Sequence, residues 1–151
     1  MKYKSVIVAN EFIKIAIDKS KPITQITLFK LVYFVNAAYL VIYGNRLVKE
    51  DFYAWKFGPV IPELYEITRK YRQNPIDQYI YKGNELDNDK NAIGCIQSIY
   101  NYFADFSPFS LVEITHAIGG AWSKVYYSQD SIGIIKDEDI KVEYRDKFSK
   151  K

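Results

Sequence analysis

The sequence predicts a mainly α-helical fold: one compact domain over residues 1–151, with about six to seven helices. Two observations predict it. Apolar residues recur every three or four positions along several segments, which is the period of one helix face. Gly-Pro, Asn-Pro and Ser-Pro pairs divide these segments with turns. A small two- or three-stranded antiparallel β element near residues 47–57 and 76–82 completes the predicted fold.

The first helix is expected over residues 6–19, because apolar side chains there fall on one face. These side chains are Ala9, Phe12, Ile13, Ala16 and Ile17. Lys21 and Pro22 follow this stretch. A proline disfavours helical backbone in the residue before it, so the helix ends ahead of this pair.

The second helix is expected over residues 27–43, with Thr24 or Thr27 accepting a backbone N–H at its start. From Leu31 onward it is apolar nearly all round, which is typical of a helix at the centre of a bundle. Asn36 interrupts this apolar stretch, which is also shorter than the ~20 residues that span a bilayer. We therefore expect a buried helix without membrane association, closed by Gly44.

The β element is expected first over residues 47–57, because aromatic residues alternate with others from Tyr53 to Phe57. Gly58-Pro59 then stops this strand. Residues 76–82 alternate weakly and are expected to pair with it.

Prolines and caps predict the helices that follow. Pro62 is expected in the first turn of a helix that continues to about residue 72, since a proline is tolerated there. Ser110 with Glu113 forms a capping-box pattern at the start of a short helix that ends by Gly119. Three further helical segments are expected around residues 93–103, 121–127 and 140–148.

Composition and charge argue against several classes of protein. The net charge is +3 and the basic residues are scattered, which falls short of the clustered basic face of a nucleic-acid-binding protein. One cysteine excludes an internal disulfide and any Cys-rich zinc site. The first twenty residues lack the layout of a signal peptide, so we expect a cytoplasmic protein.

No catalytic set, cofactor motif or metal site is visible in the sequence. His116 is the single histidine and has no HExxH or Cys/His partners. Cys95 lies on an apolar stripe, where a thiol is more often an interior residue than a nucleophile. Gly119-Gly120 lacks the residues of a phosphate-binding loop. We expect a protein that is not an enzyme, and an enzyme using His116 or Cys95 is kept only as a third hypothesis.

Two aromatic segments point to binding instead. Residues 51–65 combine five aromatic side chains with Gly58-Pro59 and a second proline, and Trp122 follows His116 closely. Trp and Tyr are enriched among the residues that dominate protein interfaces. The same side chains could equally anchor these loops to the core, and both interpretations stay open.

At these residues the chain resembles the Panacea antitoxin domain, the SocA-like or GepA-like family of phage-associated proteins. The most specific match is F-x-A-W-x-x-G-P-V-x-P-x-x-Y over residues 52–65. The run ITLFKLVYF at residues 26–34 is similar to the family's T-x-x-K-L-x-K-L-x-Y-F. It departs from that pattern at Val32, which stands where the family usually has a second lysine. Weaker matches are Ala9-Asn10 with Phe12-Ile13, and Ser110-Leu111 with Thr115-His116 and Trp122. This chain departs from the family pattern after Thr115-His116. Ala117-Ile118 replaces the usual acidic residue, and Ala121 replaces the usual proline before the tryptophan.

The resemblance spans most of the chain and implies a function. It implies a single antitoxin domain over residues 1–151 that neutralises a cognate type II toxin, encoded nearby, by direct binding. The alternatives are a DNA-binding regulator of its own operon or an adaptor that delivers a toxin to a protease. No helix-turn-helix signature stands out for the regulator, although residues 107–120 leave room for one. A homodimer is left open. The candidate partner-binding residues are Trp55, Lys56, Gly58, Pro59, Val60, Tyr65, His116 and Trp122.

Overall fold

The structure is a computed structural model that describes residues 2–128 and 132–149. Its described residues form seven α-helices, one 3₁₀ turn and one small sheet, which confirms the mainly α prediction. In chain order the elements are α1 (Ser5–Asp18), α2 (Gln25–Tyr43), β1 (Tyr53–Trp55), β2 (Gly58–Val60), α3 (Pro62–Thr68), η1 (Arg69–Tyr71), α4 (Lys90–Phe103), α5 (Pro108–Thr115), α6 (Ala121–Tyr126) and α7 (Asp137–Phe148).

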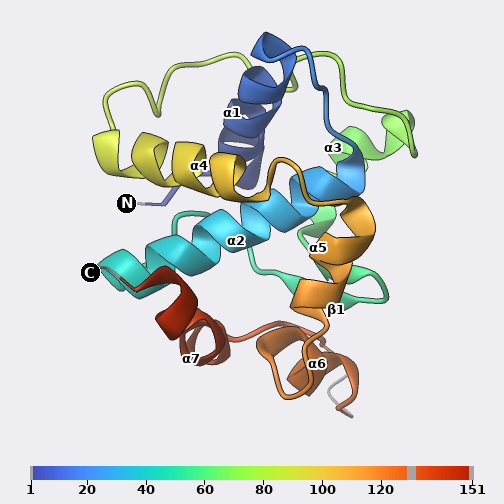
Figure 1. The fold of residues 1–151 in the computed structure, drawn as a ribbon, viewed down its shortest axis with the longest axis vertical. Helices are drawn as coiled ribbons and strands as arrows, with labels where there is room; N and C mark the ends of the chain where they lie inside the picture. Colours follow the sequence, from blue (N-terminus) through green and yellow to red (C-terminus); the bar gives the residue numbers. More distant parts are fainter. Residues whose placement is uncertain (1, 129–131, 150–151) are drawn as a thin grey trace.

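Helix α2 is the centre of the fold, as the sequence predicts. It crosses the middle of the molecule, with α1 and α4 on one side and α7 on the other (Figure 1). Every residue from Leu28 to Leu40 is buried. By length and composition α2 could cross a membrane, but 78% of its most apolar 18-residue window is buried inside the fold. That burial is what the core helix of a soluble protein shows.

Asn36 interrupts this apolar helix because its amide oxygen organises the loop that follows. Oδ1 accepts the backbone N–H groups of Leu47 and Val48 at 2.9 and 3.2 Å. The carbonyl of Leu47 in turn accepts the N–H of Tyr3 at 2.8 Å. A buried polar group is tolerated where such bonds satisfy it, so one side chain ties α2 to the segment that leads into β1.

The β element is a tight hairpin, and the predicted strand over residues 76–82 is wrong. Antiparallel β1 and β2 pair with Tyr53 opposite Val60 and Trp55 opposite Gly58. Gly58-Pro59 does not end a strand as expected, because both residues belong to β2. Gly58 has φ +123°, a conformation that favours glycine and lets the chain reverse locally.

Two other contacts explain why residues 76–82 are not a strand. Their backbone is held by Asn10, whose Oδ1 accepts the N–H groups of Ile80 and Tyr81 at 2.9 and 3.2 Å. The far edge of β1 is used by a later segment, because Ala54 donates its N–H to the carbonyl of Gly133 at 2.9 Å. Neither edge of β1 is therefore left for residues 76–82.

The helix caps agree with the sequence in part. Thr24 caps α2 by accepting the N–H of Thr27, as predicted. The predicted cap of α5 at Ser110 is wrong: Ser107 is the cap, and its Oγ accepts the N–H of Ser110 at 3.1 Å. Pro108 occupies the first helical turn, where its missing N–H is tolerated. The Ser-Pro pair that we expected to break the chain thus starts a helix.

Candidate functional site

The structure brings the predicted binding residues together around the hairpin. Helix α5 packs on β2 and α6 packs on β1, so residues near 55 and near 120 become neighbours (Figure 1). The indole Nε1 of Trp122 donates to the carbonyl oxygen of Trp55 at 2.8 Å. This bond joins the two aromatic segments that the sequence singled out.

An aromatic stack stiffens this region. The ring of Trp122 lies between His116 and Tyr126, at centroid distances of 3.7 and 4.5 Å and interplanar angles of 7° and 15°. Burial and the nearby charge of Lys30 lower the pKa of His116, so its ring is neutral at pH 7. Within residues 2–128 and 132–149, the buried Nε2 of His116 finds no hydrogen-bond partner.

Trp55 packs against Tyr65 and is also exposed to solvent. Its ring meets Tyr65 edge-on at a centroid distance of 5.3 Å, an arrangement that aromatic pairs prefer. Trp55 is nevertheless exposed, as are the next residues, Lys56 and Phe57. The ammonium of Lys56 lies 5.5 Å from the centroid of the Phe57 ring. The turn therefore presents two aromatic rings and a cation on a short, constrained loop.

The predicted site residues divide by burial. Trp55 and Lys56 are exposed, and Tyr65 and His116 are half-buried. Four others are buried and shape the hairpin from within: Gly58, Pro59, Val60 and Trp122. In this structure the buried four offer no side-chain surface to a partner.

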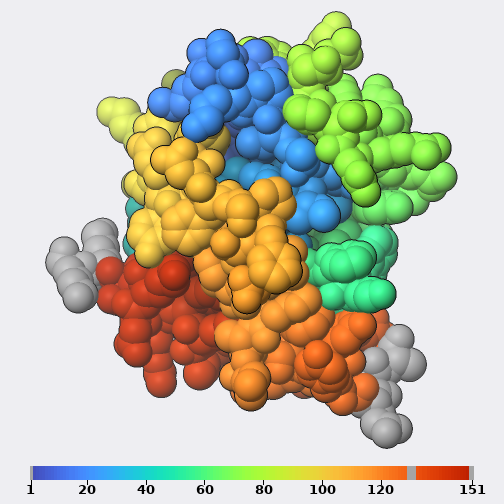
Figure 2. All heavy atoms as spheres, turned by 45° about the vertical axis from the view of Figure 1, so that its right-hand side comes forward, coloured from blue at the N-terminus to red at the C-terminus, as the bar shows by residue number. Residues whose placement is uncertain are grey.

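Some exposed residues of this region were not singled out from the sequence. Phe57 is 59% exposed and Ile118 is 102% exposed, and Tyr126 at the end of the stack is also exposed. For Ile118, the only indication in the sequence was that Ala117-Ile118 departs from the family pattern. We define the hairpin face as Trp55, Lys56, Phe57, His116, Ile118 and Tyr126. Figure 2 shows the green hairpin segment beside the orange surface of α5 and α6 on one side of the molecule.

A buried lysine lies beneath the hairpin and was also missed. Lys30 of α2 is 1% exposed, and burial lowers its pKa to about 8. A Cβ placed on Gly58 would lie 2.6 Å from both the Cε and the Nζ of Lys30. In the sequence, Lys30 stands out as a lysine in an otherwise apolar stretch, within the family-like run at residues 26–34.

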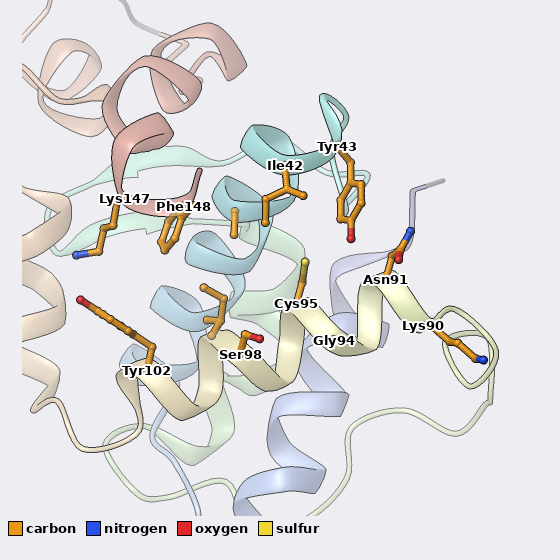
Figure 3. Close-up of a pocket in the computed structure, with 12 residues that line it drawn as sticks. Ile42, Tyr43, Lys90, Asn91, Gly94, Cys95, Ser98, Tyr102, Lys147 and Phe148 are labelled. Carbon is orange, nitrogen blue, oxygen red and sulfur yellow. The ribbon is translucent and has the colours of Figure 1, made fainter. Parts of the chain in front are cut away.

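A separate apolar groove contains Cys95, the other candidate for chemistry. It has a volume of about 430 Å³ and is lined by α2, α4 and the end of α7, with Cys95 in its wall (Figure 3). Burial raises the pKa of the Cys95 thiol, which makes it a poor nucleophile. His116 does not line this groove. In the described part of the chain, no group of three or more His, Cys, Asp or Glu residues could hold a metal ion.

The α5–α6 pair gives little support to a DNA-reading helix. Helix α6 has six residues, of which Ala121, Trp122 and Val125 are buried. Its one basic residue, Lys124, lies 3.4 Å from the carboxylate of Asp139. Phosphate contacts need several free cations on one surface, and α6 does not offer them.

Comparison with known proteins identifies a family. Residues 28–123 match the family model described as "Antitoxin SocA-like, Panacea domain". The chain is also similar to the antitoxin SocA of Caulobacter vibrioides (strain NA1000 / CB15N). It is 33% identical to that protein over 127 residues, which cover 78% of this chain and 68% of the relative. No solved structure matches.

Proposed function

Because the chain belongs to the SocA-like antitoxin family with a Panacea domain, we propose that it neutralises a cognate toxin protein by direct binding. It would act as the antitoxin of a type II toxin–antitoxin pair. This function needs a protein partner and requires no catalytic group, cofactor or metal of its own. We place it in the cytoplasm, where a free thiol such as that of Cys95 is stable.

The observation that carries this proposal is the composition of the hairpin face. Aromatic and aliphatic side chains are exposed there, around Phe57 and Ile118, over a base fixed by the Trp122 hydrogen bond and the His116 stack. Exposed aromatic residues dominate the energy of many protein interfaces. A preformed loop loses less entropy on binding than a flexible one. We therefore assign the toxin contact to this face.

Co-expression tests the proposal. The chain and each adjacent open reading frame are expressed singly and together, growth is scored, and the chain is pulled down. We expect one neighbour to be toxic alone, harmless with this chain, and recovered with it at a fixed stoichiometry. Toxicity from neither neighbour would contradict the antitoxin function.

Two other outcomes separate the alternatives. Rescue without a stable complex, lost when host proteases are deleted, would replace direct neutralisation by delivery of the toxin to a protease. Salt-sensitive gel shifts of the chain's own upstream DNA would point to repression of its operon. A pull-down between two differently tagged copies of the chain reports whether it forms a homodimer.

A further inference from the structure

Lys30 carries a buried charge without a counter-ion. Its side chain is 1% exposed in the middle of α2, the most apolar helix of the fold. In the part of the chain that the structure describes, neither an ion pair nor a hydrogen bond to its ammonium is present, and burial is the influence that lowers its pKa to about 8. The ion pairs among the described residues all use other cations, and none involves Lys30. These cations are Lys14, Lys21, Arg46, Arg69, Lys124 and Lys141.

Such a group destabilises the free protein. Transfer of an ammonium from water to an apolar interior is unfavourable unless an anion or hydrogen-bond acceptors replace the water. A methionine would fill nearly the same space in α2 without this penalty. Binding of a group from another molecule therefore explains this lysine better than packing within the free protein does.

The ammonium lies beneath the hairpin face, with one polar side chain, Thr115, nearby. The Cβ position of Gly58 is 2.6 Å from Nζ of Lys30 and 3.1 Å from Oγ1 of Thr115. Glycine at this position leaves the room that the lysine end occupies. His116 follows Thr115, and its buried Nε2 also lacks a partner among the described residues. The unpaired Lys30 ammonium thus lies against the hairpin at Gly58, and the unpartnered ring nitrogen belongs to His116, the residue that caps α5.

The charge around this place is positive. Burial, and after it the charge of Lys30, lower the pKa of His116. Lys56 lies in the turn above and has no ion pair with any described residue. A partner group that matches this site is therefore an anion small enough to pass between the turn and residues 116–118.

We propose that Lys30 is the receptor for a carboxylate of the toxin, an Asp or Glu side chain inserted between the hairpin turn and residues 116–118. Nζ of Lys30 forms the ion pair, and Nε2 of His116, carrying the proton of the neutral ring, donates a second hydrogen bond. Because Lys30 is 1% exposed, the turn at Lys56 and Phe57 moves aside when the acid enters. The inference rests on the proposed function, since the toxin supplies the acid.

Lys30→Met tests this inference, because it removes the charge and keeps a side chain of similar length. The melting temperature of the free chain is measured first, and then the Kd for the partner encoded by the adjacent gene. We expect the variant to melt at a higher temperature than the native chain and to bind at least about tenfold more weakly. Tyr79→Ser, a substitution at an exposed residue outside the hairpin face, is expected to leave the Kd unchanged.

A second measurement uses the native chain, so it does not depend on the variant. The side-chain NMR signals of ¹³C,¹⁵N-labelled lysine follow the protonation of Lys30 with pH, in the free chain and in the complex. We expect the pKa of Lys30 to rise on binding, because a carboxylate stabilises the charged form.

The outcomes separate this inference from the proposed function. If the native chain binds the partner, but Lys30→Met binds equally well or the pKa of Lys30 does not rise, the carboxylate site is wrong and the antitoxin function stands. A lower melting temperature for Lys30→Met would also overturn the inference, because the ammonium would then have a stabilising role within the free fold. If the native chain binds neither neighbouring gene product, both proposals fall.

Discussion

The indole N–H of Trp122 donates to the backbone carbonyl of Trp55 at 2.8 Å, across 67 positions of the chain. The bond joins the start of α6 to the last residue of β1. It explains how two segments that are far apart in the sequence form one surface. Trp122 is buried in this arrangement, whereas the side chain of Trp55 is exposed. One tryptophan therefore builds the hairpin face and the other forms part of it.

Replacement of Trp122 by phenylalanine is expected to destabilise the fold by about 2 kcal/mol. The change removes the hydrogen bond and leaves a small cavity beside the His116 ring. Trp55→Phe is the matched control, because the bond uses the backbone carbonyl of residue 55, and we expect it to cost below about 1 kcal/mol. Urea unfolding followed by far-UV circular dichroism measures both values. Equal losses of unfolding free energy in the two variants would contradict the conclusion that Trp122, and not Trp55, supports the hairpin.

Replacement of Gly58 by alanine is expected to be destabilising by more than about 1 kcal/mol. The residue has φ +123°, and its new Cβ would meet the end of Lys30 at 2.6 Å. Gly94→Ala is the control, since this position in α4 has nothing within 4 Å of the new Cβ. In a helix interior, alanine is favoured over glycine by about 0.5–1 kcal/mol, so the control should be stabilised. Chemical denaturation of both variants measures their unfolding free energies, which should change in opposite directions relative to the native chain.

The buried lysine makes stability depend on pH. The pKa of Lys30 is about 8 in the fold, against 10.5 for the free side chain, so between these values the unfolded chain binds more protons. Relative to Lys30→Met, the unfolding free energy of the native chain should therefore rise by about 3 kcal/mol from pH 8 to 10.5. Below pH 8 the full penalty is present and the difference should be constant. Urea unfolding at a series of pH values measures this difference, and a flat profile would contradict a buried unpaired ammonium.

Asn36 is expected to be among the most sensitive positions of the core. Asn36→Leu leaves the N–H groups of Leu47 and Val48 without their acceptor, which should cost about 2–4 kcal/mol. The amides of these two residues should also exchange with deuterium faster than those in the middle of α2. Val35→Ala, a truncation of the neighbouring buried residue, is a control that destabilises without exposing these amides selectively.

The helices were predictable because their signals are local. The all-round apolar run of α2, the Thr24 cap and Pro62 in the first turn of α3 each follow from neighbouring residues. The strand pairing was not, because it depends on which distant segment reaches each edge of β1. Asn10 holds residues 76–82 away from the hairpin, and nothing in the alternation of those residues signals that contact.

The candidate site was predictable only in outline. The motif at residues 52–65 and the later His116 and Trp122 marked the correct region of the chain. Burial decides which side chains face a partner, and it depends on tertiary packing that a sequence pattern does not specify. Trp122 became an interior residue, Ile118 became fully exposed, and Lys30 was placed beneath the turn by the crossing of α2.

The toxin contact at the hairpin face is tested by the affinity of hairpin-face variants for the partner encoded by the adjacent gene. Phe57→Ser with Ile118→Ser removes two side chains that are 59% and 102% exposed. The control pair, Tyr79→Ser with Val142→Ser, removes two that are 52% and 54% exposed outside the face. We predict an affinity about a hundredfold lower for the first pair and unchanged for the second, with both proteins folded. Unchanged binding by the first pair, or equal loss in both, would contradict the claim that the hairpin face holds the toxin.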